Sequence, residues 1–363
     1  MFNPTRLRLA RKRRGHTKSS LAVKLGVDLR AVYAYESGEY PPAEDTLRKI
    51  QLVLDFPEAF FSGDDLEEPS PDTASFRAMT KMLSGQRDMA LETGAIAFHI
   101  NNWLESKFEL PPTDLPDLSN EPTPEVAADS LRRYWGIGEM PIRNMIHLLE
   151  AKGVRVYSLA IDAREVDAFS AWKGSTPFVF LNTNKSSEHS RYDAAHELGH
   201  LILHRQGSPQ GREAERQANL FAGAFLMPRA SVLAHARPFP TLSRLIELKK
   251  IWITSLAALN YRLHEVGLTS DWVYRGLCIE IAKRGYRTKE PNGAPREVSQ
   301  ALLLMLAALR QDGIGRHKMA EALSISSTEL DQLLFGLVMT AIEGGRHKPT
   351  GKSSEPPALI RVK

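Results

Sequence analysis

The segment AAHELGHLILH, residues 194–204, places several polar side chains inside an otherwise apolar stretch. Burying imidazoles and a carboxylate is costly unless each of them finds a partner. His196 and His200 are four residues apart, so on a helix both imidazoles face the same way, one turn apart. That spacing lets two ring nitrogens approach one metal ion at about 2 Å. Glu197 points to one side of this pair, where it can accept a proton from an attacking water instead of binding the metal.

The alternative is a pair of core histidines satisfied by hydrogen bonds, which would also have to account for Glu197. A catalytic zinc usually has three protein ligands, so a third is expected downstream. The extended pattern H-E-x-x-H-x-x-G-x-x-H fails, because Leu203 and Gln206 stand where it requires Gly and His. His204 lies one turn too far along the helix to join the ion, and we expect it to support the ligands from the helix end.

The next segment, EAERQANLFAGAFLMP (213–228), is predicted to be a helix whose small Ala residues allow close packing against the first. Its Glu215 would complete a His-His-Glu set, with Glu213 as the competing candidate. Asn219 is four residues beyond Glu215 and shares its face, which makes it a second candidate for a supporting role. We therefore expect a metal held by His196, His200 and Glu215, with Glu197 as the base.

Short β-branched and aromatic runs precede this helix pair, namely VRVYSL (154–159) and TPFVFLN (176–182), and predict strands. The edge of FVFLN (178–182) is expected to pair with an extended substrate peptide beside the metal. Helical patterns flank these strands at EVAADSLRRYWGIG, at PIRNMIHLLEAKG and along a long amphipathic stretch over roughly 76–109. From 213 onward the pattern is nearly all helical, except for a loop at 288–295.

RYDAAHELGHLILH followed by ERQANLFAGAFLMP, with VFLN upstream, resembles the ImmA/IrrE family of metallopeptidases over about residues 125–265. The resemblance implies a zincin-like fold with zinc held by His196, His200 and Glu215, and Glu197 as general base. Mn²⁺ or Fe²⁺ can occupy similar ligands. Members of this family cleave a transcriptional repressor to switch on stress-response or mobile-element genes.

The first 60 residues carry a second pattern, which consists of short helical segments punctuated by glycines. Thr17 and Asp28 are suitable N-caps, Gly26 suits a turn, and Val27 and Val32 would seal the core between two helices. From Met1 to Val27 there are eight Lys or Arg residues and no Asp or Glu, which is the electrostatic footprint of a nucleic-acid binder.

The stretch TKSSLAVKLGVDLRAVYAYESG resembles the Cro/C1-type (XRE) helix-turn-helix family, in register over about residues 5–60. In that family the second helix of the pair enters the major groove of double-stranded DNA. The matching exposed positions are Leu29, Arg30 and Tyr33, and Lys18 stands where a phosphate contact is made, with Arg11–Arg14 nearby. The alternative is a three-helix packing module that binds protein.

The composition fits a soluble globular chain of two or three domains, with 363 residues, 42% hydrophobic and 25% charged. No run of eighteen apolar residues predicts a membrane span, and the basic N-terminus lacks the apolar core of a secretory signal. The single cysteine, Cys278, excludes a disulfide framework within the chain. Together these features predict a cytoplasmic protein.

The expected fold is mainly α with a small β-sheet (α+β). The expected domains are a helix-turn-helix domain (1–62), a linker and helical connector (63–122), a zincin-like core (123–268), a helical C-terminal domain (269–345) and a flexible tail (346–363). MAEALSISSTELDQLLFG (319–336) repeats the spacing of residues 21–38, with a weaker echo at 245–263. We interpret both as structural or oligomerisation elements, and a homodimer is the assembly they would allow.

Two classes of function follow. One is a DNA-tethered zinc endopeptidase that acts on a repressor or on its own chain. The other is an XRE-type transcription factor whose protease-like domain is a non-catalytic sensor or interaction module, as in a toxin–antitoxin-type system. The intact His-Glu motif and Glu215 favour the first class, and the fused DNA-binding domain supports the second.

Overall fold

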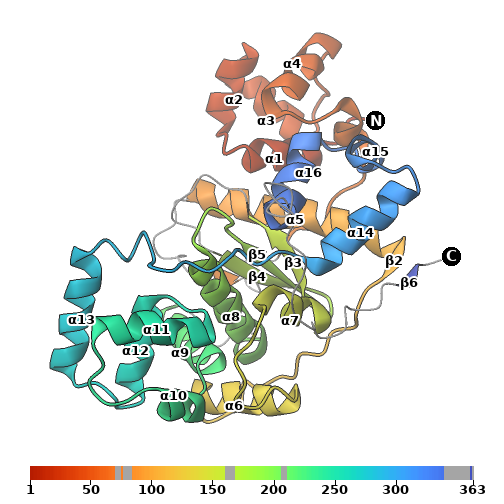
Figure 1. Cartoon of the computed structure of the whole chain (residues 1–363). Helices are drawn as coiled ribbons and strands as arrows, with labels where there is room; N and C mark the ends of the chain where they lie inside the picture. Colours follow the sequence, from red (N-terminus) through yellow and green to blue (C-terminus); the bar gives the residue numbers. More distant parts are fainter. Residues whose placement is uncertain (70–74, 77–83, 160–167, 206–210, 339–359, 362–363) are drawn as a thin grey trace.

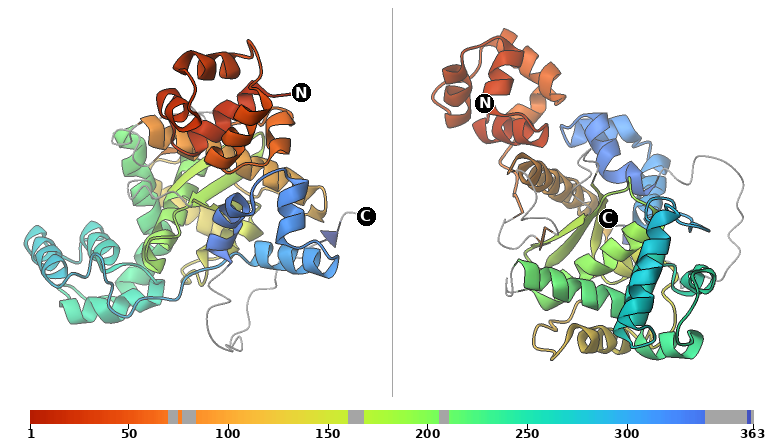
Figure 2. Two further views of the ribbon diagram at one scale, coloured as in Figure 1. Left: turned by 90° about the horizontal axis from the view of Figure 1, so that it is seen from above. Right: turned by 90° about the vertical axis from the view of Figure 1, so that its left-hand side faces the viewer.

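The computed structural model describes residues 1–69, 75–76, 84–159, 168–205, 211–338 and 360–361 (Figure 1). Helices dominate, and one small sheet lies at the centre of the molecule, so the expected fold class is confirmed. The helix-turn-helix domain stands at one end of the molecule, separated from the sheet by α5 (Figure 2). None of the helices in the described ranges is long and apolar enough to cross a membrane.

The N-terminal domain contains α1 (Pro4–Arg13), α2 (Lys18–Leu25), α3 (Leu29–Ser37), α4 (Glu44–Leu54) and the 3-10 helix η1 (Glu58–Ser62). Thr17 and Asp28 cap α2 and α3 as predicted, because their side chains accept hydrogen bonds from the first-turn N–H groups of Ser20 and Arg30. The two helices end at Gly26 and Gly38, with φ of 69° and 77°, a conformation that favours glycine.

The central sheet has the strand order β1-β4-β5-β3. Its strands are β1 (Ser75–Phe76), β3 (Arg155–Ser158), β4 (Ala168–Lys173) and β5 (Thr176–Leu181). β3 and β5 run parallel, whereas β4 is antiparallel to both β5 and β1. The runs at 154–159 and 176–182 are strands as predicted, but β5 lies between β4 and β3. The expectation that FVFLN offers a free edge to a peptide is therefore wrong, because both edges of that strand are already paired.

Helices cover the two faces of this sheet (Figure 1). On one face α5 (Ser84–Glu105) packs against an aromatic layer, in which Phe98 stands 4.5 Å from Phe178 and Phe169 stacks on Phe180 at 4.2 Å between ring centroids. On the other face α8 (Ser187–Leu203) lies against β4 and β5. Strand alternation explains this arrangement, since Phe169, Phe178 and Phe180 point to one face, whereas Ser170 points to the other, toward α8.

The lower part of the molecule is helical. It contains α6 (Pro124–Tyr134), α7 (Met145–Ala151), α9 (Arg212–Leu226), α10 (Arg229–His235), α11 (Leu242–Trp252), α12 (Leu256–Glu265) and α13 (Asp271–Lys283). α9 packs against α8 and α6, and α11 and α12 pack against each other. These contacts hold α9 alongside α8, so that side chains of the two helices can meet.

The C-terminal helices return to the N-terminal domain. They are α14 (Gln300–Gln311), α15 (Arg316–Ala322), α16 (Ser327–Leu334) and the 3-10 helix η2 (Phe335–Leu337). α16 packs against β3, and its Glu329 forms ion pairs with Arg13 and Arg14 of α1. The repeat at 319–336 thus makes an intramolecular contact, in line with its structural interpretation.

The tail predicted over 346–363 lies mostly outside the described residues. Its Ile360–Arg361 forms β6, which pairs antiparallel with β2 (Phe108–Glu109). The predicted division into five segments stays a prediction, and two features bear on it. β1 and α5 come from the expected connector but are built onto the central sheet, and the C-terminal helices contact both the sheet and α1.

Candidate metal centre and DNA-binding face

α8 carries the HELGH motif through the middle of the molecule. It begins after Ser186, whose side chain accepts a hydrogen bond from the N–H of His189, and it ends at His204. His196 and Glu197 are fully buried, and His200 is nearly so. The two imidazoles face the same side of α8, as their spacing predicts, with their Nε2 atoms 3.1 Å apart.

The third member of the cluster comes from the neighbouring helix. α9 approaches α8 closely at Gly199, where an added Cβ would lie 3.0 Å from the ring of Phe221 and 3.3 Å from Cα of Ala218. A larger residue at Gly199 would push the helices apart. This close approach brings the carboxylate of Glu215, in the first turn of α9, to the two histidines. Ala218 was expected to allow such packing, whereas the role of Gly199 was not predicted.

The three side chains fit one tetrahedral zinc ion. Glu215 Oε2 is 3.5 Å from His196 Nε2, and Glu215 Oε1 is 3.3 Å from His200 Nε2. With metal–ligand bonds of about 2.1 Å, the ligand atoms of a tetrahedral ion are about 3.4 Å apart. The set matches these edges, and Glu215 is the most exposed of the three side chains, at 25%.

The electrostatics favour an ionised carboxylate at this position. Burial raises the pKa of Glu215, but hydrogen bonds and charge interactions with His196 and His200 outweigh it and lower the pKa to about 2. A carboxylate that is ionised over the whole physiological range is the form that binds a metal.

Glu197 lies beside this cluster, on the face of α8 that meets the sheet. Its Oε2 accepts a 2.8 Å hydrogen bond from Ser170 Oγ, in the middle of β4. Both side chains are buried, so this contact fixes the position of the carboxylate. The sequence did not single out Ser170, because β4 carries no motif and becomes adjacent to α8 only when the sheet forms.

The other candidate residues lie around the cluster. His204 Nδ1 is 3.0 Å from His200 Nδ1, and its Nε2 is 3.1 Å from the Gln217 side chain. Burial, followed by the charge of His200, lowers the pKa of His204 to about 4. Asn219 donates to the backbone oxygen of Glu215 and does not reach its carboxylate. Glu213 is half-exposed and pairs with Arg216, outside the cluster.

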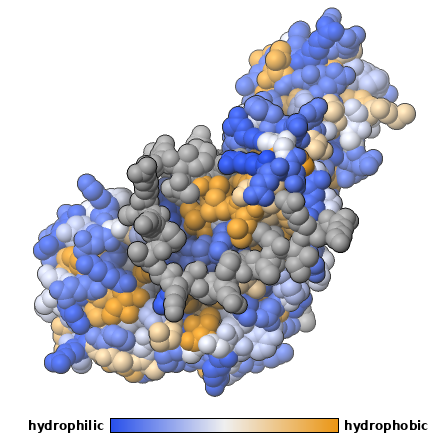
Figure 3. Space-filling model, turned by 45° about the vertical axis from the view of Figure 1, so that its right-hand side comes forward, coloured by the Kyte–Doolittle hydropathy of each residue, from blue (hydrophilic) through white to orange (hydrophobic). Residues whose placement is uncertain are grey.

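The N-terminal domain presents α3 to solvent. Arg30 is exposed, and Leu29 and Tyr33 are 41% and 53% exposed. Lys18 Nζ lies 3.9 Å from the centre of the Tyr33 ring and 3.5 Å from a Glu36 oxygen. The structure therefore places all four predicted DNA-binding residues together on one face of the domain. Figure 3 shows this domain as a separate, mostly hydrophilic lobe at the top of the molecule.

Several basic residues at the N-terminus form ion pairs with carboxylates of the same chain. Arg13 and Arg14 both pair with Glu329, and Arg11 pairs with Glu36. Arg11 and Arg13 are buried. These three arginines are thus paired with carboxylates of the same chain, which reduces the positive charge that they can offer to a phosphate.

Comparison with known families agrees with both parts of the molecule. Residues 7–61 match the helix-turn-helix family model, and residues 149–264 match the model of the IrrE N-terminal-like domain, a peptidase family. The second match contains β3, β4, β5, α8 and α9, and so includes the whole cluster. No curated protein matches the sequence significantly. The chain is therefore a fusion of an XRE-type helix-turn-helix DNA-binding domain with a metallopeptidase-like domain of the IrrE/ImmA type.

Proposed function

We propose that the protein is a DNA-binding regulator with a zinc-dependent endopeptidase site, which cleaves a repressor-type protein or its own chain. The observation that carries the proposal is the set of three ligand-atom distances, 3.1, 3.3 and 3.5 Å, beside a buried carboxylate that is not part of the set. This is the ligand number and geometry of a catalytic zinc with one open position. The regulated genes would be stress-response or mobile-element genes, as the family resemblance implies.

Each residue has a distinct role in this proposal. His196, His200 and Glu215 hold the ion, for which Zn²⁺ is the first candidate and Mn²⁺ or Fe²⁺ are alternatives. When bound, the ion supplies Lewis-acid chemistry that polarises the scissile carbonyl and lowers the pKa of water. Glu197 accepts the proton of the attacking water at a carboxylate oxygen and passes it to the leaving amine. Ser170 keeps that carboxylate oriented, and the buried surroundings exclude bulk water from it.

Glu197→Gln separates hydrolysis from metal binding, because it removes the base but keeps the size and hydrogen bonding of the side chain. We expect the variant to bind one zinc per chain and to cleave unfolded casein at least about a hundredfold more slowly than the parent. Zinc is measured by mass spectrometry of the metal and cleavage by electrophoresis. A variant that cuts as fast as the parent would show that Glu197 is not the base.

A second candidate is a transcription factor whose metal-binding domain acts only as a sensor. The favouring observation is the buried connection between Glu329 and the two arginines of α1, since α16 also packs against β3 of the sheet on which α8 lies. A conformational change caused by metal binding could thus be transmitted through the sheet and α16 to the DNA-binding domain without hydrolysis. Regulation that survives Glu197→Gln but not loss of the metal would favour this candidate.

A further inference from the structure

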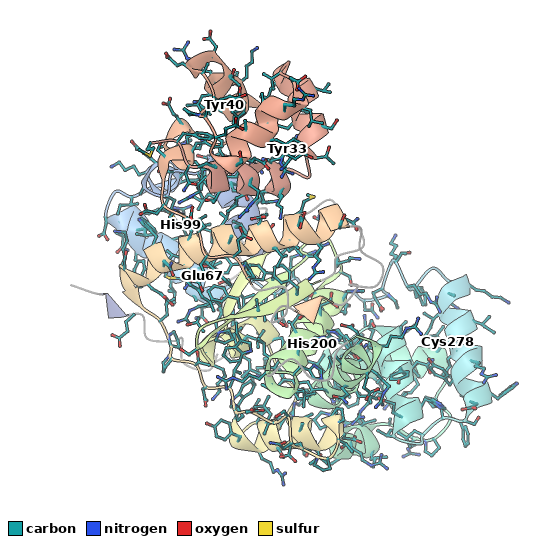
Figure 4. All side chains as sticks on the ribbon, turned by 180° about the vertical axis from the view of Figure 1, so that it is seen from behind. Tyr33, Tyr40, Glu67, His99, His200 and Cys278 are labelled. Carbon is teal, nitrogen blue, oxygen red and sulfur yellow. The ribbon has the colours of Figure 1, made fainter. Side chains whose placement is uncertain are left out.

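The edge of the sheet nearest the metal cluster is already occupied by the protein's own chain. β1 pairs antiparallel with β4, with Ser75 opposite Ser170 and Phe76 opposite Phe169. Ser170 is the residue whose hydroxyl holds Glu197. Figure 4 labels His200 in the part of the molecule drawn in green, which contains the sheet and α8. The backbone of Ser75 is therefore one strand spacing from the residue that contacts the proposed base.

The segment before β1 is anchored along the same strand. Glu67 lies 3.5 Å from Lys173, at the end of β4. Pro69 packs on Gly94 of α5 so closely that a Cβ at Gly94 would collide with the proline ring, and the ring of Phe169 of β4 lies next to the same position. The contacts of Glu67 and Pro69 and the pairing of Ser75–Phe76 thus all lie at the outer edge of β4 or at its end.

A peptide added to a sheet edge is the usual way in which proteins bind an extended segment. We propose that the first substrate of the metal site is the chain's own segment at Ser75–Phe76, cleaved within the same molecule. The inference rests on the proposed endopeptidase function. The tether keeps the segment at a high effective concentration, so that this substrate precedes any separate protein in occupying the edge.

The reaction is an ordinary peptide hydrolysis. Water adds its oxygen to a backbone carbonyl carbon of the segment, the C–N bond breaks, and the proton accepted by Glu197 goes to the leaving amine. The products are a new carboxylate and a new amino terminus. Cleavage here cuts the chain between the helix-turn-helix domain and the metallopeptidase-like domain. Non-covalent contacts, among them the pairs of Arg13 and Arg14 with Glu329, would then hold the DNA-binding domain in place.

The test uses the full-length protein, purified without metal and then given Zn²⁺ alone. Intact-mass spectrometry should detect two complementary fragments, whose masses place the cleaved bond within a few residues of Ser75–Phe76. The first-order rate should not change on dilution, because the reaction is intramolecular. Glu197→Gln should give no fragments. Gly94→Ala should slow the self-cleavage about tenfold, since displacing Pro69 misplaces the segment, while cleavage of unfolded casein in the same tube is not slowed.

A second readout does not depend on catalysis. In metal-free protein the backbone amides of β4 should exchange slowly with deuterated water, and Phe76→Pro, which removes a backbone donor from β1, should speed up their exchange. Casein cleavage without any self-cleavage would overturn the inference and leave the proposed function intact. Failure to cleave either substrate by a zinc-loaded protein would overturn both. A first-order rate constant of self-cleavage that rises in proportion to protein concentration would overturn the intramolecular reaction and show that one molecule cleaves another.

Discussion

Glu215 and Glu213 are two residues apart on α9, but only Glu215 faces α8. The Glu213 carboxylate pairs with Arg216 on the outer surface, whereas that of Glu215 lies between two imidazoles. This difference follows from helix geometry, because residues two apart point to opposite sides of a helix. The assignment of the third ligand therefore depends on which face of α9 packs on α8.

Glu215→Ala removes the only carboxylate of the three-residue set, so we expect it to lower zinc affinity by at least about a hundredfold. Glu213→Ala is the matched control and should retain the parent's affinity, because it loses contacts with Arg216 and Gln217 but no member of the ligand set. Competition with a chromogenic chelator measures both variants. Normal zinc binding by Glu215→Ala together with loss in Glu213→Ala would reverse the assignment.

At the scale of single elements, α3 is the part of the N-terminal domain that we propose to contact DNA. Arg30 and Tyr33 are exposed on it, and neither Arg30 nor Lys24 of α2 has an ion-pair partner among the described residues. Most of the other basic residues of the first 27 are paired with carboxylates of the same chain. The domain thus offers far fewer free cations than its sequence suggests.

Arg30→Ala and Tyr33→Ala should each weaken binding to a duplex selected from a random pool by about 1–3 kcal/mol, without changing zinc content. The logarithm of affinity should fall with the logarithm of salt concentration with a slope of about −2 to −4 per chain. Eight phosphate contacts would give a slope near −7. Fluorescence anisotropy over a salt series measures both. Loss of zinc from either variant would contradict the separation of the two sites.

The sequence predicted side-chain positions correctly where all the residues of a motif lie on one helix. The spacing of His196 and His200 fixes their common face, and the caps Thr17 and Asp28 act within one turn. It failed where partners are distant in the chain. Ser170 reaches Glu197 only through the order of the strands, and the same order buries both edges of β5.

The arginines near the N-terminus also have partners that are distant in the sequence. Arg13 meets its partner Glu329 across 316 positions of sequence. No pattern within α1 could reveal that Arg13 and Arg14 pair with a carboxylate of α16. Charge counted along a sequence therefore overstates the charge that a folded domain presents to DNA.

At the scale of the whole molecule, Glu329 connects the two functional parts. It is fully buried; burial raises its pKa, but the charges of Arg13 and Arg14 outweigh this and hold the pKa below its usual value. α16, which carries it, also packs against the central sheet. Glu329 thus helps to join the DNA-binding domain to the body of the protein, in addition to the packing of α1 on α5.

Glu329→Gln leaves two arginines without their counter-charge, so we expect a loss of about 3–5 kcal/mol in the free energy of unfolding. Asp331→Asn on the same helix is the control. Its partner Arg316 is exposed, and removing that pair should cost less than about 1 kcal/mol. Urea unfolding followed by circular dichroism compares the two. Equal effects would show that the Glu329 cluster does not connect the domains energetically.

The central claim is that this regulator acts by hydrolysis at the cluster formed by α8 and α9. The most direct measurement is the response of the genes that the protein controls, compared between cells carrying the parent protein and cells carrying Glu197→Gln at equal abundance and equal zinc content. The account predicts that the variant still occupies its DNA sites but fails to change transcription when the inducing condition is applied. A variant that regulates those genes as fully as the parent would contradict it.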